Sequence, residues 1–498
     1  MALDKDAAVL VVGAGIMGAG IAQVAAQAGH RVWLQDARAG AAAQAHARLA
    51  DTLDKLVAKG RVAAGDAQSA LQRVQPVQAL AEAATAGLVV EAIVEDLEAK
   101  RALFAELESL LPDDAVLATN TSSISVTAIA RGLHLPGRLV GMHFFNPVPL
   151  MRLVEVVSGL QTDAGAASAV FDLAQAWGKT PVHARSTPGF IVNRIARPYY
   201  AEALQLLLEQ AAEPATLDAC LRSAGFRMGP CELMDLIGHD TNFAVTRSVY
   251  DANFQDKRFG PSLVQQEMVA GGLLGRKSGR GFYAYGDGPP TLPAFEPGPA
   301  PFAQQVVLHG SGPLAERLAL ALAGRSFDRR PDSAWAGLEV DGARLSLTDG
   351  RCATALGTEV AVFDLPVQPT LAGGEPGMPL AYAVSQRASA AWGGAVPQWL
   401  RAAGLRPLRV ADAPGLVVAR TLAMLVNEAC DAVHHGVCSE AGADAAMKLG
   451  VNYPAGPFEW LARWGAGPVV ALLDALDAHY RGERYRVSPW LRLRAAAP

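Results

Sequence analysis

A histidine and a glutamate twelve residues apart are the two side chains of this sequence best suited to general acid–base chemistry. His143 lies in G-M-H-F-F-N-P-V-P at 141–149, and Glu155 lies in R-L-V-E-V-V at 152–157. A carboxylate flanked by valines is costly to bury unless it is paired, and His143 is the natural partner. Such a pair fixes the imidazole tautomer and stabilises imidazolium. A lone histidine is more often structural, but this pairing predicts a general base oriented by an acid.

A glycine-rich turn supplies the second piece of chemistry. The segment V-L-V-V-G-A-G-I-M-G-A-G-I-A at 9–22 carries G-x-G-x-x-G directly after a predicted strand and at the start of a predicted helix. In this context the glycines permit a tight turn and a close approach of the backbone to a pyrophosphate, which the helix N-terminus attracts. We expect dinucleotide contacts from these turn residues: Gly13, Gly15, Ile16, Met17 and Gly18.

Asp36 ends the next predicted strand, eighteen residues after Gly18. A carboxylate there accepts hydrogen bonds from the adenosine ribose diol. It would repel a 2′-phosphate by roughly 4 kcal/mol at a separation of about 4 Å. The sequence therefore favours NAD over NADP, with the nearby Arg38 as the one feature that weakens this preference.

Further polar residues follow other predicted strands. Glu95 and Lys100 come after the strand at 88–93, and T-N-T-S-S at 119–123 follows the next one. The carboxyl ends of the strands face the cofactor in open parallel sheets. Glu95 and Lys100 are thus placed to meet ribose or nicotinamide, although each alone is more often an ordinary charge at a helix start.

The elements that must position these residues alternate in type over the first 160 residues. Short, continuously apolar runs alternate with Ala-rich helical stretches, as is typical of a doubly wound parallel sheet covered on both faces. The expected strands are Val9–Val12, Arg31–Gln35, Leu88–Ile93, Val116–Thr119, Leu139–Met142 and Leu153–Val157. A Rossmann-type α/β domain is predicted, followed by an all-α domain.

Composition limits the class of protein. The chain has 498 residues, 51% hydrophobic and 18% charged, with 43 basic and 48 acidic residues. This argues against disorder and against nucleic acid as a partner. Five cysteines without C-x-x-C or zinc spacing favour a reduced compartment and no metal. No apolar run reaches the roughly 20 residues of a membrane span, and the N-terminus lacks signal-peptide features. We expect a soluble cytoplasmic protein.

The motifs together resemble one family, the L-3-hydroxyacyl-CoA dehydrogenases of fatty-acid oxidation. The resemblance covers residues from about 7 to about 285, and the whole architecture is similar to the longer bacterial members, including the 3-hydroxybutyryl-CoA and phenylacetate-pathway 3-hydroxyadipyl-CoA dehydrogenases. It rests on V-G-A-G-I-M-G-A-G-I-A, V-E-A-I-V-E-D, N-T-S-S, H-F-F-N-P-V, L-V-E-V-V, T-P-G-F-I-V-N-R and G-R-K-S-G-R-G-F-Y.

The resemblance implies a role for each matched residue. The catalytic pair falls on His143 and Glu155, and the residues that hold the substrate oxygens fall on Ser122 and Asn193. Cofactor contacts fall on Asp36, Glu95, Lys100, Ser122, Asn146 and Lys277. CoA contacts fall on Thr52, which replaces the serine expected there, and on Lys59.

The implied reaction is the reversible oxidation of an L-3-hydroxyacyl-CoA to the 3-ketoacyl-CoA with NAD, in fatty-acid or phenylacetate-type catabolism. One alternative is a redox-inactive NAD- or CoA-binding relative, against which the retained Ser122, His143, Glu155 and Asn193 speak. A flavin-binding Rossmann enzyme would account for the glycines but not for the His–Glu pair. The sequence leaves open the acyl-chain length and the presence of a distal carboxylate.

The second half of the chain contains an internal repeat. T-P-V-H-A-R-S-T-P-G-F-I-V-N-R at 180–194 aligns with R-P-L-R-V-A-D-A-P-G-L-V-V-A-R at 406–420, and Glu202 aligns with Glu428. Asn193 corresponds to Ala419, so the repeat has lost one predicted site residue. The expected domains along the chain are an NAD-binding domain at 1–186, a helical domain at 187–285, a Pro-rich linker at 286–302, a degenerate Rossmann-like module without cofactor at 303–405, and a second helical domain at 406–498. We expect the two helical copies to form an internal pseudo-dimer, with dimerisation of the whole chain left open.

Overall fold

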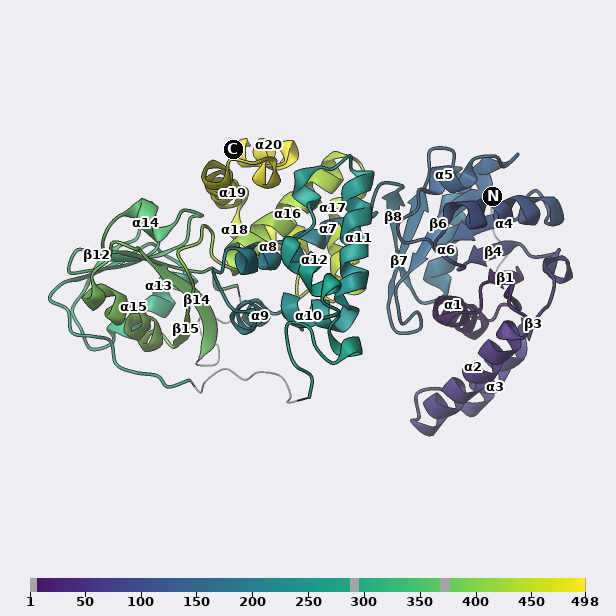
Figure 1. The fold of residues 1–498 in the computed structure, drawn as a ribbon, viewed down its shortest axis with the longest axis horizontal. Coiled ribbons are helices and arrows are strands. Elements are labelled where there is room, and N and C mark those ends of the chain that lie inside the picture. The colour runs from purple at the N-terminus through teal and green to yellow at the C-terminus, as the bar shows by residue number, and fades with distance from the viewer. Residues whose placement is uncertain (1–6, 287–294, 368–376, 498) are drawn as a thin grey trace. The chain divides into compact units, whose positions relative to one another are not determined.

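The computed structural model describes residues 7–286, 295–367 and 377–497 (Figure 1). The chain forms two compact units, one of Met1–Arg194 with His435–Val451 and the other of Ile195–His434 with Asn452–Pro498. Most of the proposed linker at 286–302 is described, but residues 287–294 lie outside the described residues, as do 368–376 of the proposed small module.

An eight-stranded sheet is the centre of the first unit. Its order is β3-β2-β1-β4-β5-β6-β7-β8, and all neighbours are parallel except β6 and β7, which are antiparallel. The strands are β1 (Val9–Val12), β2 (Val32–Gln35), β3 (Val74–Pro76), β4 (Leu88–Glu91), β5 (Val116–Thr119), β6 (Leu139–Phe144), β7 (Leu153–Ser158) and β8 (Thr180–Arg185). The six expected strands are present, whereas β3 and β8 were not expected, because each has few consecutive apolar residues.

Helices cover this sheet on both faces and bury its central strands. All four residues of β1 are buried, which explains why the strand is apolar throughout and not alternating. The helices of the first unit are α1 (Ile16–Gln27), α2 (Ala41–Ala58), α3 (Ala64–Arg73), α4 (Leu97–Leu110), α5 (Val126–Ala130), α6 (Ala164–Ala176), α17 (Glu440–Gly450) and the start of α7 (Val192–Ile195). Helices α2 and α3 lie side by side as a hairpin that projects from the sheet (Figure 1).

Helix α17 comes from the second copy of the repeat, yet it packs on β7 and β8 of the first unit. The segment before the helix lies along the edge of the sheet, where Arg185 donates its backbone N–H to the carbonyl of Val437 at 2.8 Å. Part of the second helical copy therefore completes the edge of the N-terminal sheet.

The second unit contains a mixed seven-stranded sheet of order β10-β9-β11-β12-β13-β14-β15. Its strands are β9 (Val306–His309), β10 (Asp328–Arg330), β11 (Gly337–Val340), β12 (Ala343–Leu347), β13 (Val360–Phe363), β14 (Met378–Val384) and β15 (Leu405–Arg409). Three of the six neighbour pairs are antiparallel, those of β11 with β9, β11 with β12, and β13 with β14. The sheet is thus a reduced and rearranged relative of the first.

In the second unit α8 and α16 contact each other, and α10, α12, α18, α19 and α20 each pack on one of them, whereas α13, α14 and α15 pack on the sheet. The helices are α8 (Arg197–Leu208), α9 (Pro214–Ser223), α10 (Pro230–Ile237), α11 (His239–Ala252), α12 (Leu263–Ala270), α13 (Pro313–Ala319), α14 (Ala353–Leu356), α15 (Ala390–Ala402), α16 (Val418–His434), α18 (Pro457–Trp464), α19 (Ala466–Tyr480) and α20 (Pro489–Ala496). Within the described ranges, no helix is both long and apolar enough to cross a membrane.

Candidate active site

Strands β6 and β7 bring His143 and Glu155 together. Their antiparallel register sets the two residues opposite each other, and Nδ1 of His143 lies 2.5 Å from Oε2 of Glu155. Both side chains are buried, with 7% and 0% of their surface exposed. The other carboxylate oxygen of Glu155 accepts the backbone N–H groups of Ile191 and Val192 at 3.1 and 2.9 Å. These bonds compensate the buried charge, so Glu155 can hold Nδ1–H and leave Nε2 to accept a proton.

Asn193 is placed by the same carboxylate. It follows Val192 at the start of α7, and Glu155 caps the free N–H groups of that first turn. The chain therefore fixes the backbone of Asn193 one residue from a group bonded to Glu155. The structure brings these three predicted residues together within the first unit.

The turn that carries Ser122 is organised around Glu95. One oxygen of this carboxylate accepts the hydroxyl of Thr121 at 2.7 Å, the backbone N–H and hydroxyl of Ser122 at 2.9 and 3.3 Å, and those of Ser123, both at 3.1 Å. Burial raises the pKa of Glu95, but Lys100 and these hydrogen bonds outweigh burial and lower it overall. Glu95 is thus an ionised anchor for the predicted substrate-binding serine.

Lys100 lies beneath Glu95 and is almost fully buried, with 1% of its side chain exposed. Its ammonium group is 2.6 Å from Glu91 and 3.3 Å from Glu95. Glu91 also accepts the hydroxyl of Thr119 at 2.7 Å. In this structure Lys100 therefore supports the Ser122 turn through Glu95, a role that the spacing of charges along the helix did not suggest.

Asn120 connects the Ser122 turn to the strand of His143, and sequence analysis missed it. Its Oδ1 accepts the backbone N–H of Phe144 at 2.8 Å, directly after His143. The signal was present in T-N-T-S-S, where an asparagine follows a buried strand. The turn and the catalytic strand are thus fixed relative to each other.

The glycine-rich turn has the geometry that a bound pyrophosphate needs. Gly13 has φ of +105°, and a Cβ atom there would lie 2.4 Å from the carbonyl oxygen of Ala92. A Cβ atom at Gly18 would lie 1.7 Å from the carbonyl oxygen of Gly13, so only glycine fits. Gly15 caps α1 without a side-chain partner, and Ile16 is exposed beside it. Free N–H groups at this helix start can receive phosphate oxygens.

Asp36 lies next to this turn, at the end of β2. Its carboxylate accepts the backbone N–H of Ala14 at 2.8 Å and Nε of Arg38 at 3.1 Å. Burial raises the pKa of Asp36, but the hydrogen bonds from Arg38 and Ala14 outweigh it, and the pKa is lowered overall. An ionised carboxylate at this point can accept the hydrogen bonds of a ribose diol.

The loop between β6 and β7 carries Asn146, which is exposed. Lys179 holds this loop, because its ammonium group donates to the carbonyl of Val148 at 2.5 Å and to that of Met151 at 2.9 Å. Burial lowers the pKa of Lys179 to about 8. Lys179 was not expected from the sequence, because the strand that follows it, β8, has only a weak apolar pattern.

Three more predicted residues lie on elements other than β6 and β7. Thr52 is exposed on α2, where its hydroxyl donates to the carbonyl of Arg48 at 2.8 Å, and Lys59 is exposed directly after that helix. Lys277 belongs to the second unit, where it forms an ion pair with Asp240 at 2.5 Å.

The second copy of the internal repeat does not keep the glutamate of the His143–Glu155 pair. The position that corresponds to Glu155 is Ala381, and across the ladder from it Asp364 donates its N–H to the Ala381 carbonyl at 2.9 Å. The Asp364 carboxylate accepts the backbone N–H groups of Val417, Val418 and Ala419, between 2.7 and 2.9 Å. A helix-capping carboxylate is kept, but it comes from the neighbouring strand, and no histidine among the described residues is hydrogen-bonded to it.

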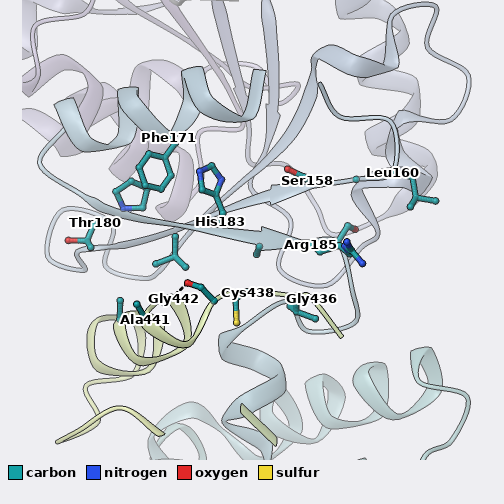
Figure 2. A pocket seen from close by; sticks show the side chains of 18 residues that line it. Ser158, Leu160, Phe171, Thr180, His183, Arg185, Gly436, Cys438, Ala441 and Gly442 are labelled. Carbon is teal, nitrogen blue, oxygen red and sulfur yellow. Dashed lines mark hydrogen bonds between the residues drawn. The ribbon is translucent and has the colours of Figure 1, made fainter. Parts of the chain in front are cut away.

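A groove of about 940 Å³ runs along the outer side of β8 (Figure 2). One wall carries His183 and Phe171, whose rings stack with centroids 4.4 Å apart, and the other carries Gly436, Cys438 and Gly442 from the segment before and within α17. None of the predicted site residues lines it. The groove is thus a feature of the sheet edge and does not belong to the His–Glu site.

Three protein-family models match parts of the chain. "3-hydroxyacyl-CoA dehydrogenase, NAD binding domain" matches residues 8–187, and "3-hydroxyacyl-CoA dehydrogenase, C-terminal domain" matches 189–285 and 415–498. "3-hydroxybutyryl-CoA dehydrogenase reduced Rossmann-fold domain" matches 345–414.

Similar proteins extend over the whole chain. A 3-hydroxyadipyl-CoA dehydrogenase of Escherichia coli K12 is 44% identical over 488 residues, which cover 98% of this chain and 97% of that protein. The crystal structure of a 3-hydroxybutyryl-CoA dehydrogenase from Escherichia coli K12 is similar with a TM-score of 0.89 and 42% identity, over 99% of this chain and 98% of that one. An (S)-3-hydroxybutyryl-CoA dehydrogenase from Ralstonia eutropha, with a TM-score of 0.55 and 38% identity, covers 57% of this chain and 100% of its own.

Proposed function

Because the chain belongs to the 3-hydroxyacyl-CoA dehydrogenase family, we propose that it oxidises an L-3-hydroxyacyl-CoA to the 3-ketoacyl-CoA with His143 as the general base. The observation that carries this proposal is the 2.5 Å contact between Nδ1 of His143 and Oε2 of Glu155. NAD accepts the hydride in this family, and the glycine-rich turn, with its positive φ at Gly13 and open helix start, fits that cofactor.

The proton of the 3-hydroxyl goes to Nε2 of His143. Loss of this proton accompanies loss of hydride from C3, so electron density on the oxygen becomes the C=O bond of the product. The imidazolium that results carries Nδ1–H toward Glu155, whose negative charge stabilises it. The two backbone N–H groups on Glu155 keep its second oxygen from turning toward the ring.

Ser122 and Asn193 are proposed to hold the substrate oxygens during this step. Ser122 lies on a turn that Glu95 and Asn120 fix beside β6, and Asn193 lies on the helix start that Glu155 caps. Positioning of this kind lowers the entropic cost of bringing C3 and the base together.

Cofactor and CoA contacts follow the same proposal. Asp36 accepts the ribose hydroxyls, the turn residues Gly13 to Gly18 receive the pyrophosphate, and Glu95, Asn146 and Lys277 complete the site, with Lys100 acting through Glu95. Thr52 and Lys59 are exposed on the α2 hairpin, where a CoA phosphate could meet the lysine.

We also propose that the two helical copies form an internal pseudo-dimer. Two kinds of contact, an ion pair and a backbone hydrogen bond, each occur twice, and the two occurrences are related by an offset of 226 residues in the sequence. Arg258 pairs with Glu428 at 3.3 Å and Arg484 pairs with Glu202 at 2.9 Å, each arginine reaching from one copy to the other. This reciprocity is expected of an isologous interface.

The sheet edges show the same exchange. Arg185 on β8 donates its backbone N–H to Val437 at 2.8 Å, and Ala411 after β15 donates to Ala211 at 2.8 Å. The groove of Figure 2 has a counterpart beside β15, lined by Gln210, Ala211, Val384 and Ala411 among others. Each sheet is thus completed by the helical copy of the other half.

A direct assay tests the proposed activity. The purified chain, given NAD and L-3-hydroxybutyryl-CoA, should form NADH, and the D-isomer should give none. A chain that bound NAD but formed no NADH with C4, C6 or longer L-3-hydroxyacyl thioesters would belong to the redox-inactive alternative.

A further inference from the structure

Helix α17, which the second helical copy contributes to the first unit, ends against strand β7. Its last residue, Gly450, is buried. A Cβ atom at Gly450 would lie 2.6 Å from Cδ2 of Leu153. The same atom would lie 3.1 Å from Cγ2 of Val192 and 3.7 Å from Cε1 of Phe145. Three side chains of the N-terminal domain therefore enclose the end of this helix, and its backbone comes close to them because no side chain stands between.

Each of these three side chains lies next to a residue of the predicted catalytic group. The ring of Phe145 packs on the imidazole of His143, with the two centroids 4.5 Å apart. Leu153 lies two residues before Glu155 on β7, so the two side chains share one face of the strand. Val192 donates its backbone N–H to the Glu155 carboxylate at 2.9 Å. The end of α17 thus contacts the immediate neighbours of both members of the pair.

The space at this helix end is too small for a methyl group. Carbon atoms in contact are normally about 3.5–4.0 Å apart, so a Cβ atom at 2.6 Å from Leu153 would displace the strand or the helix by about 1 Å. A misplacement of about 1 Å can lower a rate by about a hundredfold. Alanine is a better helix former than glycine, so helix propensity alone predicts no harm from Gly450→Ala.

The segment that leads into α17 reaches the same region from its other end. Nδ1 of His435 lies 3.1 Å from Nη2 of Arg194, which directly follows Asn193. The pKa of the Cys438 thiol is raised to about 12, first by burial and then by the negative charge of Glu155, while Arg194 opposes this rise. Both ends of the segment at 435–450 therefore lie close to the predicted catalytic residues.

The corresponding contact in the second unit differs at one point. There the first-copy helix α9 packs on β14, and the last residue of α9 is Ser223. The Ser223 hydroxyl lies 2.8 Å from the carbonyl oxygen of Pro379, which is the counterpart of Leu153 in the repeat. Strand β14 has Ala381 where β7 has Glu155. A side chain thus stands at the helix end beside the strand without the glutamate, and a glycine beside the strand that carries it.

We propose that the second helical copy is a positioning element for the catalytic pair, and that Gly450 sets how closely α17 supports the strands of His143 and Glu155. This inference rests on the proposed function and deepens it, because the second copy then helps to arrange the site of the first. Gly450 is a positioning residue, since it acts through Phe145 and Leu153 and touches no reacting group.

Gly450→Ala tests this role in the full-length chain. With L-3-hydroxybutyryl-CoA and NAD, kcat should fall by at least about tenfold, while the KM values for both stay within about threefold, because the pair and not the binding of either compound is disturbed. Gly442→Ala is the matched control on the same helix. A Cβ atom at Gly442 would lie 2.9 Å from Cγ1 of Val182 on β8, away from β6 and β7, and kcat should stay within about twofold.

A compensating substitution shows whether the effect passes through Leu153. Leu153→Val removes Cδ2, the atom nearest to the new methyl group. The double variant Gly450→Ala/Leu153→Val should therefore recover kcat to within about threefold of Leu153→Val alone. If Gly450→Ala does not yield folded protein, this pair of variants carries the test. A double variant that kept the full loss relative to Leu153→Val would overturn the proposal.

A measurement without turnover separates this inference from the proposed function. The Nδ1 proton of His143, in its 2.5 Å contact with Glu155, should give a downfield proton resonance that is assigned by its loss in His143→Gln. This resonance should shift in Gly450→Ala and stay in place in Gly442→Ala. An unchanged resonance or a wild-type kcat in Gly450→Ala would overturn the proposal, and so would an equal loss of kcat in Gly442→Ala. A wild type that formed no NADH would overturn the proposed function instead.

Discussion

The imidazole of His143 and the carboxylate of Glu155 meet across two antiparallel strands, with 2.5 Å between Nδ1 and Oε2. The single antiparallel step in an otherwise parallel sheet makes this contact, since it sets two strand positions directly opposite each other. The second oxygen of Glu155 caps the helix start before Asn193. One carboxylate thus contacts the proposed base and holds the helix start that carries Asn193.

Glu155→Gln should lower kcat by at least about tenfold, because the imidazolium loses its neighbouring charge while the hydrogen-bond geometry is largely kept. Steady-state kinetics with saturating NAD would measure this. Glu108→Gln is the matched control: Glu108 also accepts two backbone N–H groups, at 2.8 and 2.9 Å, but contacts no catalytic residue. Wild-type kcat in Glu155→Gln would show that the carboxylate serves folding alone.

The fold class, the cofactor and the class of reaction could be predicted from the sequence. The family, the Rossmann-type fold class, NAD and the oxidoreductase activity are confirmed. They depend on local signals, namely glycines after a buried strand and polar residues at strand ends. The acyl-CoA class of the substrate agrees with the family, while the roles of individual residues, the domain boundaries and the pseudo-dimer remain predictions.

Other features depend on tertiary contacts that no local pattern encodes. Lys100 was expected at the cofactor, but only the fold shows it buried between Glu91 and Glu95. Strand β8 contains a proline and two exposed residues in six, so its apolar signal is weak. The placement of α17 on the N-terminal sheet follows from an exchange between distant halves of the chain. The positions of Lys100, β8 and α17 are all set by contacts between residues far apart in the sequence.

The reciprocal ion pairs should both be essential to stability. Arg258→Met would remove the cation that pairs with both Glu428 and Asp431, and Arg484→Met would remove one of the two arginines that hold Glu202. Breaking a buried pair typically costs about 3–5 kcal/mol. Urea unfolding should show a loss of this order for Arg258→Met and a smaller one for Arg484→Met, since Arg420 stays on Glu202.

The exposed pair of Arg329 with Glu316, at 2.8 Å, provides the control for these variants. Arg329→Met should change the free energy of unfolding by less than about 1 kcal/mol. If Arg258→Met were as mild as Arg329→Met, the contacts between the helical copies would not hold the pseudo-dimer together.

Asp364 should make stability depend on pH. Burial raises its pKa to about 6, although backbone N–H groups oppose this, and the unfolded value is about 3.9. The folded state therefore binds the proton more tightly, and this stabilisation is lost as pH rises through about 6. Between pH 5 and pH 7.5 the wild type should lose about 1 kcal/mol relative to Asp364→Asn in urea unfolding.

Asp349→Asn is the comparison variant, because the pKa of Asp349 is shifted in the opposite direction to that of Asp364. Burial raises the pKa of Asp349, but the hydrogen bonds and charge of Arg351 outweigh it and lower the pKa overall. The Asp349 carboxylate thus contributes stability that is lost as pH falls. A wild-type stability that rose relative to Asp364→Asn between pH 5 and pH 7.5 would contradict the account of Asp364.

The central claim is that His143 takes the proton of the 3-hydroxyl, and His143→Gln tests it most directly. NADH formation with an L-3-hydroxyacyl-CoA should fall in kcat by at least about a hundredfold, while the Kd for NAD measured by titration stays within about twofold of the wild type. Turnover within a few fold of the wild type, with cofactor binding intact, would contradict the assignment of the base.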